Sequence, residues 1–312
     1  MKTARKIISY TLWTIVLFYL GVAVLLHVPA VQQWTGGIVA SALAGKLGTR
    51  VQIGRVDLGF LNRIIIDDVQ IWDQHRQKML SAGRLSAKVD LVPLFDGQVH
   101  ISSAQAFGLA ANLYQQNADT PPNFQFVLDS LASKSKSPKT PLDLQIQSLV
   151  IRNGAVSWNR HDIAPTARKF NPAHLNITGL STHIILNKLT DDSISLKVKH
   201  FALKEASGLD VRSLKFRFNA GKHSASLSNF VLNLPQSHLA LPSLTARYRM
   251  KGKQLDKESL SYHVLLSPSS IRPADLTFIE PALKRLHQLV TLQAEVKCTD
   301  KQMDIGQLRI AS

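Results

Sequence analysis

Few residues in this chain are spaced for catalysis. Ser133 and Lys136 fit the Ser-x-x-Lys pattern in which a lysine activates a serine, but they lie in a polar linker where chance explains them better. His161, Asp162 and His174 are better explained as solvated or hydrogen-bonded side chains than as metal ligands. The sequence contains no phosphate-binding loop, zinc-protease motif or nucleophile elbow. We therefore expect no enzymatic activity, no metal and no other cofactor.

Charge and composition narrow the class of protein. The 312 residues carry a net charge of +16, yet only 19% are charged, which argues against a disordered tail. The single cysteine excludes an intramolecular disulfide framework. Basic residues alternate with apolar ones, as at Lys197 and Lys199 and at Lys215 and Arg217. A solvated strand face explains this spacing best, and attraction to anionic lipid surfaces is the alternative. No recognition helix or aromatic RNA-binding motif is present, so we expect no nucleic-acid partner.

The elements that would position any site are strands with a recurring eight-residue pattern. The pattern reads apolar, x, apolar, two mostly polar or turn-type residues, apolar, x, apolar. Period-two alternation predicts a strand with one apolar face, and the two inserted residues shift the phase by one. A bulge there would keep both halves of the segment facing the same side. The nine copies span residues 51–58, 64–71, 99–106, 144–151, 175–182, 209–216, 225–232, 239–246 and 303–310.

A sheet built from such strands must cover its apolar face. We predict a mainly β (α+β) fold in which an elongated, curved sheet forms a gutter with a few short helices, and a closed two-sheet sandwich is the alternative. One acyl chain of roughly 16 carbons buried there would contribute on the order of 12 kcal/mol. The expected lining consists of apolar residues of the repeats. These are Val51, Ile53, Ile66, Val69, Ile146, Leu149, Val211, Leu214, Leu227 and Phe230.

The N-terminus carries a targeting signal. An uncharged apolar run of 20 residues begins at Ile7, includes Trp13 and Phe18, and ends at Leu26, long enough to span a bilayer as a helix. Three basic residues precede it and predict a cytoplasmic start. They are Lys2, Arg5 and Lys6. A cleaved signal peptide is the alternative, but the run is longer than the usual core of about 7 to 15 residues. The sequence predicts an uncleaved single-pass membrane anchor.

Five segments follow from these patterns. Residues 1–28 form the cytoplasmic stub and anchor, and 29–48 an amphipathic linker helix with Val31, Trp34 and Ile38 on its apolar side. Residues 49–116 begin the β-groove, and 117–141 form a polar excursion with a short helix near 123–131. Residues 142–312 continue the groove, with two short helical pieces at 273–288. The pattern stops without a closing element, so we expect a longer polypeptide truncated here.

Several stretches resemble a known family. Residues 45–73, which read GKLGTRVQIGRVDLGFLNRIIIDDVQIWD, are similar to the start of AsmA-like and TamB translocation-and-assembly-module proteins. Residues 144–158, 205–221, 227–241 and 271–298 resemble the same family. The resemblance implies an inner-membrane anchor, with the bulk of the chain in the periplasm as a long β-sheet gutter. It also implies movement of phospholipid toward the outer membrane, or assembly of outer-membrane proteins with a β-barrel partner. The family's characteristic C-terminal domain is absent from the sequence, so partner binding through it does not carry over.

Two functions follow as expectations. The first is a bridge-like carrier of phospholipid between inner and outer membrane, in which acyl chains slide along the apolar groove while headgroups stay in water. The second is a periplasmic scaffold for outer-membrane β-barrel assembly, whose open sheet edge would template an incoming strand.

Overall fold

A computed structural model describes residues 10–14, 17–18, 21, 24, 28–59, 62–90, 99–132, 142–143, 147–167, 169–190, 193–251, 254–299 and 302–312. The predicted β-rich class is confirmed, because strands make up 59% of the protein and helices are few. The chain divides into two compact units. Unit 1 comprises residues 1–102 and 124–144, and unit 2 comprises residues 103–123 and 145–312. The boundary between residues 102 and 103 falls within a strand, β5 (Val99–Phe107). The two units therefore do not coincide with the five segments expected from the sequence.

The predicted membrane anchor needs a correction. No helix among the described residues is long and apolar enough to cross a bilayer. The predicted location, a single-pass inner-membrane protein with its bulk in the periplasm, is therefore not supported and is wrong on this evidence. The longest described helical run within residues 7–26 is 10–14, which contains Trp13, while Phe18 belongs to a second short piece. The remaining anchor and topology residues named above lie outside the described residues. They are Lys2, Arg5, Lys6, Ile7 and Leu26.

Unit 1 contains a small antiparallel sheet covered by a helix. Its central strand β3 (Arg63–Trp72) pairs on one side with β4 (Lys78–Val89), and on the other with β1 (Val51–Gln52) and then β2 (Arg55–Gly59). The helix α2 (Pro29–Leu47) packs against β1 and β2. A short helix α4 (Gln125–Ala132) and the two-residue strand β7 (Leu142–Asp143) complete the unit. The start of β5 (Val99–Phe107) pairs with β7 in parallel.

Local signals in the sequence define α2, but its buried side differs from the predicted one. Pro29 stands in the first turn, where its missing N–H costs no hydrogen bond, and Gly48 ends the helix with a φ of 64°. Trp34 and Ile38, predicted to lie on the packed apolar side, are 68% and 50% exposed. The buried residues are Gln32 and Gly36. A Cβ at Gly36 would lie 3.3 Å from the Cα of Arg55, so the close approach of helix and strand decides which side is buried.

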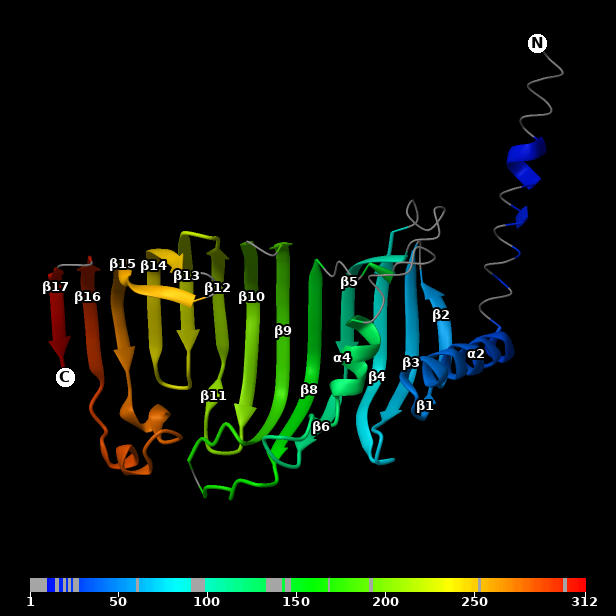
Figure 1. The fold of residues 1–312 in the computed structure, drawn as a ribbon, viewed down its shortest axis with the longest axis horizontal. Helices are drawn as coiled ribbons and strands as arrows, with labels where there is room; N and C mark the ends of the chain where they lie inside the picture. The colour runs from blue at the N-terminus through cyan, green and yellow to red at the C-terminus, as the bar shows by residue number, and fades with distance from the viewer. Residues whose placement is uncertain are drawn as a thin grey trace, which may run out of the picture. The chain divides into compact units, whose positions relative to one another are not determined.

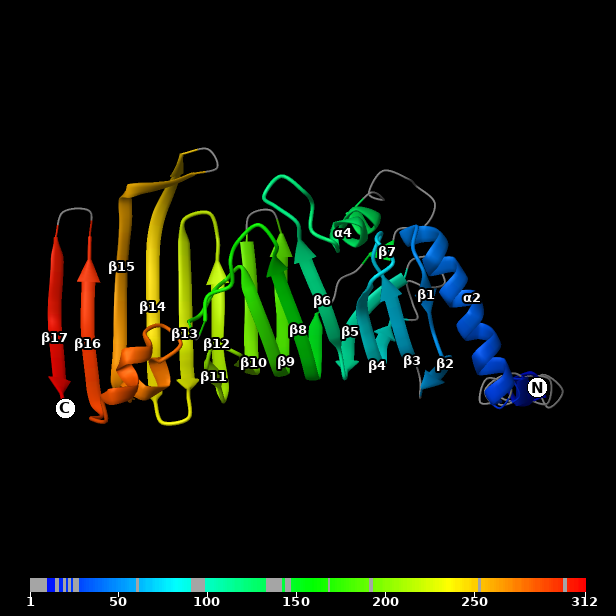
Figure 2. The same cartoon turned by 90° about the horizontal axis from the view of Figure 1, so that it is seen from below.

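Unit 2 is one extended sheet. Figures 1 and 2 show its strands side by side in chain order from β8 to β17, and neighbouring strands are antiparallel. The second half of β5 and then β6 (Ala110–Gln115) pair in parallel along β8. The remaining elements are β8 (Ser148–Arg160), β9 (His174–Thr190), β10 (Ser193–Glu205), β11 (Asp210–Val211), β12 (Ser213–Ala220), β13 (Ser224–Asn233), β14 (His238–Lys251), β15 (Gln254–Ile271), the 3₁₀ helices η1 (Pro273–Leu276) and η2 (Pro281–Arg285), β16 (Val290–Cys298) and β17 (Met303–Ala311).

Left-handed backbone conformations account for the break in three copies of the eight-residue repeat. The fifth residue of three predicted copies has a positive φ: Asp68 at 56°, Gly179 at 60° and Asn229 at 54°. Gly, Asn and Asp are the residue types that tolerate this conformation at the least cost. Such a residue interrupts the strict alternation of a strand, so the apolar positions before and after it can face the same side. In these three copies the fifth residue is thus Asp, Gly or Asn for a backbone reason.

The same feature occurs in neighbouring strands of unit 2. Gly108, between β5 and β6, and Asn153 in β8 have φ values of 59° and 53°. They lie beside each other, because the N–H of Gly108 donates to the carbonyl oxygen of Arg152 at 3.0 Å. The β8–β9 pairing is irregular at the same level, between Ile151 and Gly154. The structure therefore places the phase change of β8 two residues beyond the copy predicted at 144–151.

Candidate functional site

The largest chemically uniform feature of unit 2 is a row of apolar side chains across its sheet. Each member stands directly opposite the next on the neighbouring strand. Residues directly opposite one another share a face of the sheet. Strands lie about 4.8 Å apart, so eight of them extend the row over about 33 Å. We call this set the apolar row: Leu186, Leu196, Phe218, Leu227, Leu244, Val264, Val296 and Ile305.

A neighbouring row is entirely polar and lies one residue along each strand, or two along β9, where the register with β10 shifts. Its members also stand opposite one another, and they face the other side of the sheet because successive side chains alternate. Hydrogen bonds join some of them, such as that from the Ser195 hydroxyl to Asn219 Oδ1 at 2.7 Å. The polar row consists of Lys188, Ser195, Asn219, Ser226, Thr245, His263, Lys297 and Asp304. The sheet of unit 2 is therefore amphipathic over eight strands.

The apolar face continues beyond the phase change in β13. The Phe216 ring lies 6.3 Å from the Phe230 ring, and Phe218 stands opposite Leu227. Phe216 and Phe218 are alternate residues of β12 and share a face. Leu227 and Phe230 therefore also share that face, although they are three residues apart. Phe230 in turn stands opposite Leu241 of β14, so the apolar face is several residues wide.

The described residues of unit 2 form one sheet and two short 3₁₀ helices, with no second sheet or long helix to cover this face. Seven of the eight members of the apolar row are half-buried, and Ile305 is 53% exposed. Half-burial leaves part of the surface of these side chains accessible. The closed-sandwich alternative does not describe unit 2.

The predicted lining residues fall into three groups. Leu149, Leu214, Leu227 and Phe230 are half-buried residues of unit 2, and Val211 is 8% exposed. Ile146 lies outside the described residues. The other four belong to the helix-covered sheet of unit 1, where Val51 and Val69 are buried and Ile53 and Ile66 half-buried.

Most of the apolar row was absent from the sequence-based list. Leu227 is the only member that the list contained. Leu244 and Ile305 occupy apolar positions of the predicted repeats, and the other members lie elsewhere in apolar stretches of their strands. The cross-strand register that aligns them is not encoded in any single segment.

Loops and the two 3₁₀ helices are tied together at one end of the strands of unit 2. The Phe170 N–H donates to the Phe278 carbonyl oxygen at 2.7 Å, and their rings meet edge to face at 6.4 Å. Lys169 and Glu280 form an ion pair of 2.8 Å, which lowers the pKa of Glu280. The Asp275 carboxylate accepts from the Ser237 hydroxyl at 2.7 Å. These contacts fix η1 and η2 against the loops at 161–173 and 234–237, within the stretch where the sequence predicted two short helical pieces.

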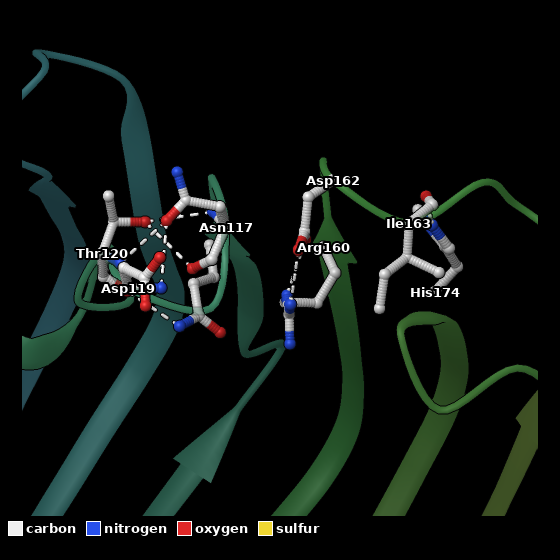
Figure 3. A network of polar contacts seen from close by, with 8 residues as sticks. Asn117, Asp119, Thr120, Arg160, Asp162, Ile163 and His174 are labelled. Atoms are coloured by element: carbon white, nitrogen blue, oxygen red, sulfur yellow. Dashed lines mark hydrogen bonds and ion pairs between the residues drawn. The ribbon is translucent and has the colours of Figure 1, made fainter.

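A polar network occupies the ends of β6, β8 and β9 (Figure 3). Asn117 Oδ1 accepts from the N–H groups of Asp119 and Thr120, each at 3.0 Å, which closes the turn after β6. Arg160 holds Asp162 through two hydrogen bonds of 2.6 and 2.8 Å, and this pairing lowers the pKa of Asp162. His174 Nε2 lies 2.6 Å from the Ile163 carbonyl oxygen. His161 Nδ1 lies 3.0 Å from Gln116 Oε1, so His161, Asp162 and His174 each have a local hydrogen-bond partner.

A buried carboxylate fixes the turn between β10 and β11. Glu205 is 8% exposed, and its oxygens accept from the N–H of Asn176 at 3.1 Å and of Ser207 at 2.7 Å. Burial opposes its ionisation, but hydrogen bonds from the Ser207 hydroxyl and from backbone N–H groups outweigh it and lower the pKa of Glu205. Among the described residues, no group of three or more His, Cys, Asp and Glu side chains is placed to hold a metal ion.

Comparisons with known proteins do not extend this description. No family model, no curated protein and no solved structure matches the chain.

Proposed function

We propose that unit 2 is a carrier of phospholipid whose acyl chains lie along the apolar row. The observation that carries the proposal is the row itself, eight apolar residues in register, each half-buried or exposed. In this proposal the sheet is an open gutter, and the apolar face stays uncovered because its occupant is a lipid. The resemblance of residues 45–73 and later stretches to AsmA-like and TamB proteins favours the same function, although the comparisons supply no match.

The dimensions and energies support an acyl chain as the occupant. The row extends about 33 Å, and the hydrocarbon core of a bilayer, which holds two chains end to end, is about 30 Å thick. Covering one side of a chain of 16 carbons yields about half of the full transfer free energy, or about 6 kcal/mol. Apolar contact of this kind is not directional, so a chain can shift along the row with little change in free energy.

The charge of the protein supports a phospholipid over a neutral lipid. A net charge of +16 attracts anionic headgroups and membrane surfaces. Basic side chains such as Lys215 and Arg217 are exposed on β12, on the face opposite the apolar Phe216 and Phe218. Headgroups would remain in water in this proposal, so no headgroup-specific pocket is needed.

Lipid extraction and native mass spectrometry of the full chain test the proposal. We expect phospholipid to co-purify with the wild type and to be lost in Leu244→Asp, which places a charge in the apolar row. The matched control is Thr245→Asp, the next residue along β14, which faces the polar side and is exposed. Equal lipid content in the two variants would contradict the proposal, as would a wild type that carries no lipid or carries peptide instead. Circular dichroism establishes that both variants keep their strands.

A further inference from the structure

Unit 1 contains a small cavity where the end of helix α2 meets the hairpin between β3 and β4. Its volume is about 360 Å³, at the lower end of the range for small-ligand sites. Residues 48–50, directly after α2, form one wall. Residues 72–74 and Arg76, at the end of β3 and in the turn that follows, form the other. We call it the arginine cavity, because Arg50 and Arg76 both line it.

Hydrogen bonds join the two walls of the arginine cavity. The Trp72 N–H donates to the Arg50 carbonyl oxygen at 3.1 Å. The Thr49 hydroxyl lies 3.0 Å from the carbonyl oxygen of Trp72. Gln74 Nε2 donates to the carbonyl oxygen of Leu47 at 3.3 Å. These contacts fix the backbone on both sides, so the cavity is already formed in the protein without a ligand.

Arg76 stands in a tight turn, in a conformation that arginine rarely adopts. Its φ is 63°, a left-handed value that Gly and Asn accept at lower cost. The carbonyl oxygen of Asp73 accepts from the Arg76 N–H at 3.0 Å. Asp73 Oδ1 also accepts from the N–H groups of His75 and Gln77, each at 2.9 Å. Strained residues of this kind are concentrated at ligand sites, and here the turn holds an arginine at the cavity.

An aromatic ring orients the second arginine. The Arg50 Cζ lies 4.4 Å from the centre of the Trp72 ring, which is the distance of a cation–π contact. A guanidinium held over a ring face keeps N–H donors available at its edge. Arg50 can therefore contact Trp72 and an oxyanion at the same time.

Neither arginine is neutralised within the part of the chain that the structure describes. No described residue forms an ion pair or a side-chain hydrogen bond with the guanidinium of Arg50 or Arg76. Asp73 is the one acidic residue among the described residues that line the cavity, and it is 1% exposed. The accessible charges of the arginine cavity are therefore both positive, which attracts an anion.

We propose that the arginine cavity binds inorganic phosphate or a phosphate monoester between Arg50 and Arg76. A guanidinium binds two oxygens of an oxyanion through its fork of N–H donors. A carboxylate has two oxygens, so one arginine satisfies it. A phosphate monoester has three acceptor oxygens and a charge of about −1.5 to −2 at pH 7, enough for two arginines.

The same chemistry is offered by two sources, free phosphate and the headgroup of phosphatidic acid. Both present a phosphate with at least three accessible oxygens to the two arginines. The site belongs to unit 1, and the proposal does not depend on lipid carriage by unit 2.

Isothermal titration calorimetry of the full chain with inorganic phosphate tests the site. We expect saturable binding of one phosphate per chain. Arg50→Gln and Arg76→Asn should each raise the dissociation constant at least about tenfold, because each removes a charged hydrogen-bond donor. Asn suits the φ of position 76, so Arg76→Asn should keep its fold, and circular dichroism checks both variants.

The matched control is Lys78→Gln. It removes the same charge from an exposed residue of the same hairpin that does not line the cavity, so phosphate should bind as in the wild type. Acetate should bind the wild type at least about tenfold more weakly than phosphate, because a carboxylate has fewer oxygens to share. A wild type that binds no phosphate, or a loss in Lys78→Gln equal to that in the arginine variants, would overturn the proposal.

Vesicle flotation distinguishes the two sources of phosphate. Vesicles of phosphatidylcholine with phosphatidic acid are compared with vesicles of phosphatidylcholine alone. Extra capture by phosphatidic acid that is lost in Arg50→Gln and Arg76→Asn, and kept in Lys78→Gln, would assign the cavity to a lipid headgroup. Capture that is the same in all variants, together with arginine-dependent binding in calorimetry, would assign it to free phosphate. If neither measurement depended on the two arginines, the proposal would be wrong.

Discussion

The rings of Phe216 and Phe230 lie 6.3 Å apart and are tilted by 31°. They come from adjacent strands, and Phe230 is on the far side of the left-handed residue Asn229 from Leu227. The contact therefore joins the two halves of an interrupted strand into one apolar face. We expect a double-mutant cycle of Phe216→Leu and Phe230→Leu to give a coupling free energy of about 1 kcal/mol, measured by urea denaturation. Additive effects would indicate that the rings do not interact.

Asn229 should tolerate only residues that accept a positive φ. Its φ is 54°, a conformation that costs L-residues with a Cβ about 1 to 2 kcal/mol, and β-branched residues the most. Asn229→Val should lower the free energy of unfolding by about that amount, while Asn229→Gly should be close to neutral. Urea denaturation followed by circular dichroism measures both. If the two variants were equally stable, the phase change would not depend on this conformation.

Gly36 and Gly37 form a matched pair in helix α2. A Cβ at Gly36 would approach the Cα of Arg55 to 3.3 Å, whereas a Cβ at Gly37 meets nothing within 4 Å. Gly36→Ala should therefore destabilise unit 1 by about 1 to 3 kcal/mol through overpacking, partly offset by helix propensity. Gly37→Ala should stabilise it by about 0.5 to 1 kcal/mol. Thermal unfolding followed by tryptophan fluorescence distinguishes them, and a stabilising effect of both would mean that α2 does not pack as described.

Asp67 should make the stability of unit 1 sensitive to acid. Its carboxylate lies 2.7 Å from Nε of Arg84 and 2.7 Å from Nε of Arg55, and the hydrogen bond from Arg84 is the largest cause of its lowered pKa. A group whose pKa is lower in the folded state stabilises above its unfolded pKa and loses that contribution as pH falls through the folded value. The stabilising contribution of the Asp67 carboxylate should be complete above about pH 3.8 and should decline below it.

Two neutralising substitutions measure this contribution. Asp67→Asn should cost about 2 kcal/mol at pH 7, the range for hydrogen bonds to a charged group, and should reduce the loss of stability below pH 3.8. Asp68→Asn removes the same charge from the neighbouring exposed position and keeps a residue type suited to its φ of 56°. It should change stability little. If both variants lost a similar free energy of unfolding in urea at pH 7, the loss would come from the change in net charge and not from the ion pairs of Asp67.

The sequence by itself determined the strands and their interruptions. Alternation marks the apolar side of each strand, and in three copies of the repeat the Asp, Gly or Asn in the middle stands where the backbone is left-handed. Asp68, Gly179 and Asn229 all stand at the predicted break because only a few residue types accept that backbone. These signals are local, so a single segment contains them. They were sufficient to predict the β-rich class and to place Leu227 and Phe230 on an apolar strand face.

Only the tertiary structure decided which apolar residues meet and which are covered. The apolar row depends on the register of eight strands, and a slip of one residue would turn a strand's whole apolar set to the other face. Val51 and Leu227 carry the same pattern in the sequence, yet Val51 is buried in a sheet under α2 and Leu227 lies half-buried on an open one. Helix packing also decided which side of α2 is buried. Gly36 lets the helix approach the strand more closely than Trp34 or Ile38 would, so the predicted apolar side is exposed. Register and covering layer join residues far apart in the chain, and local pattern does not encode them.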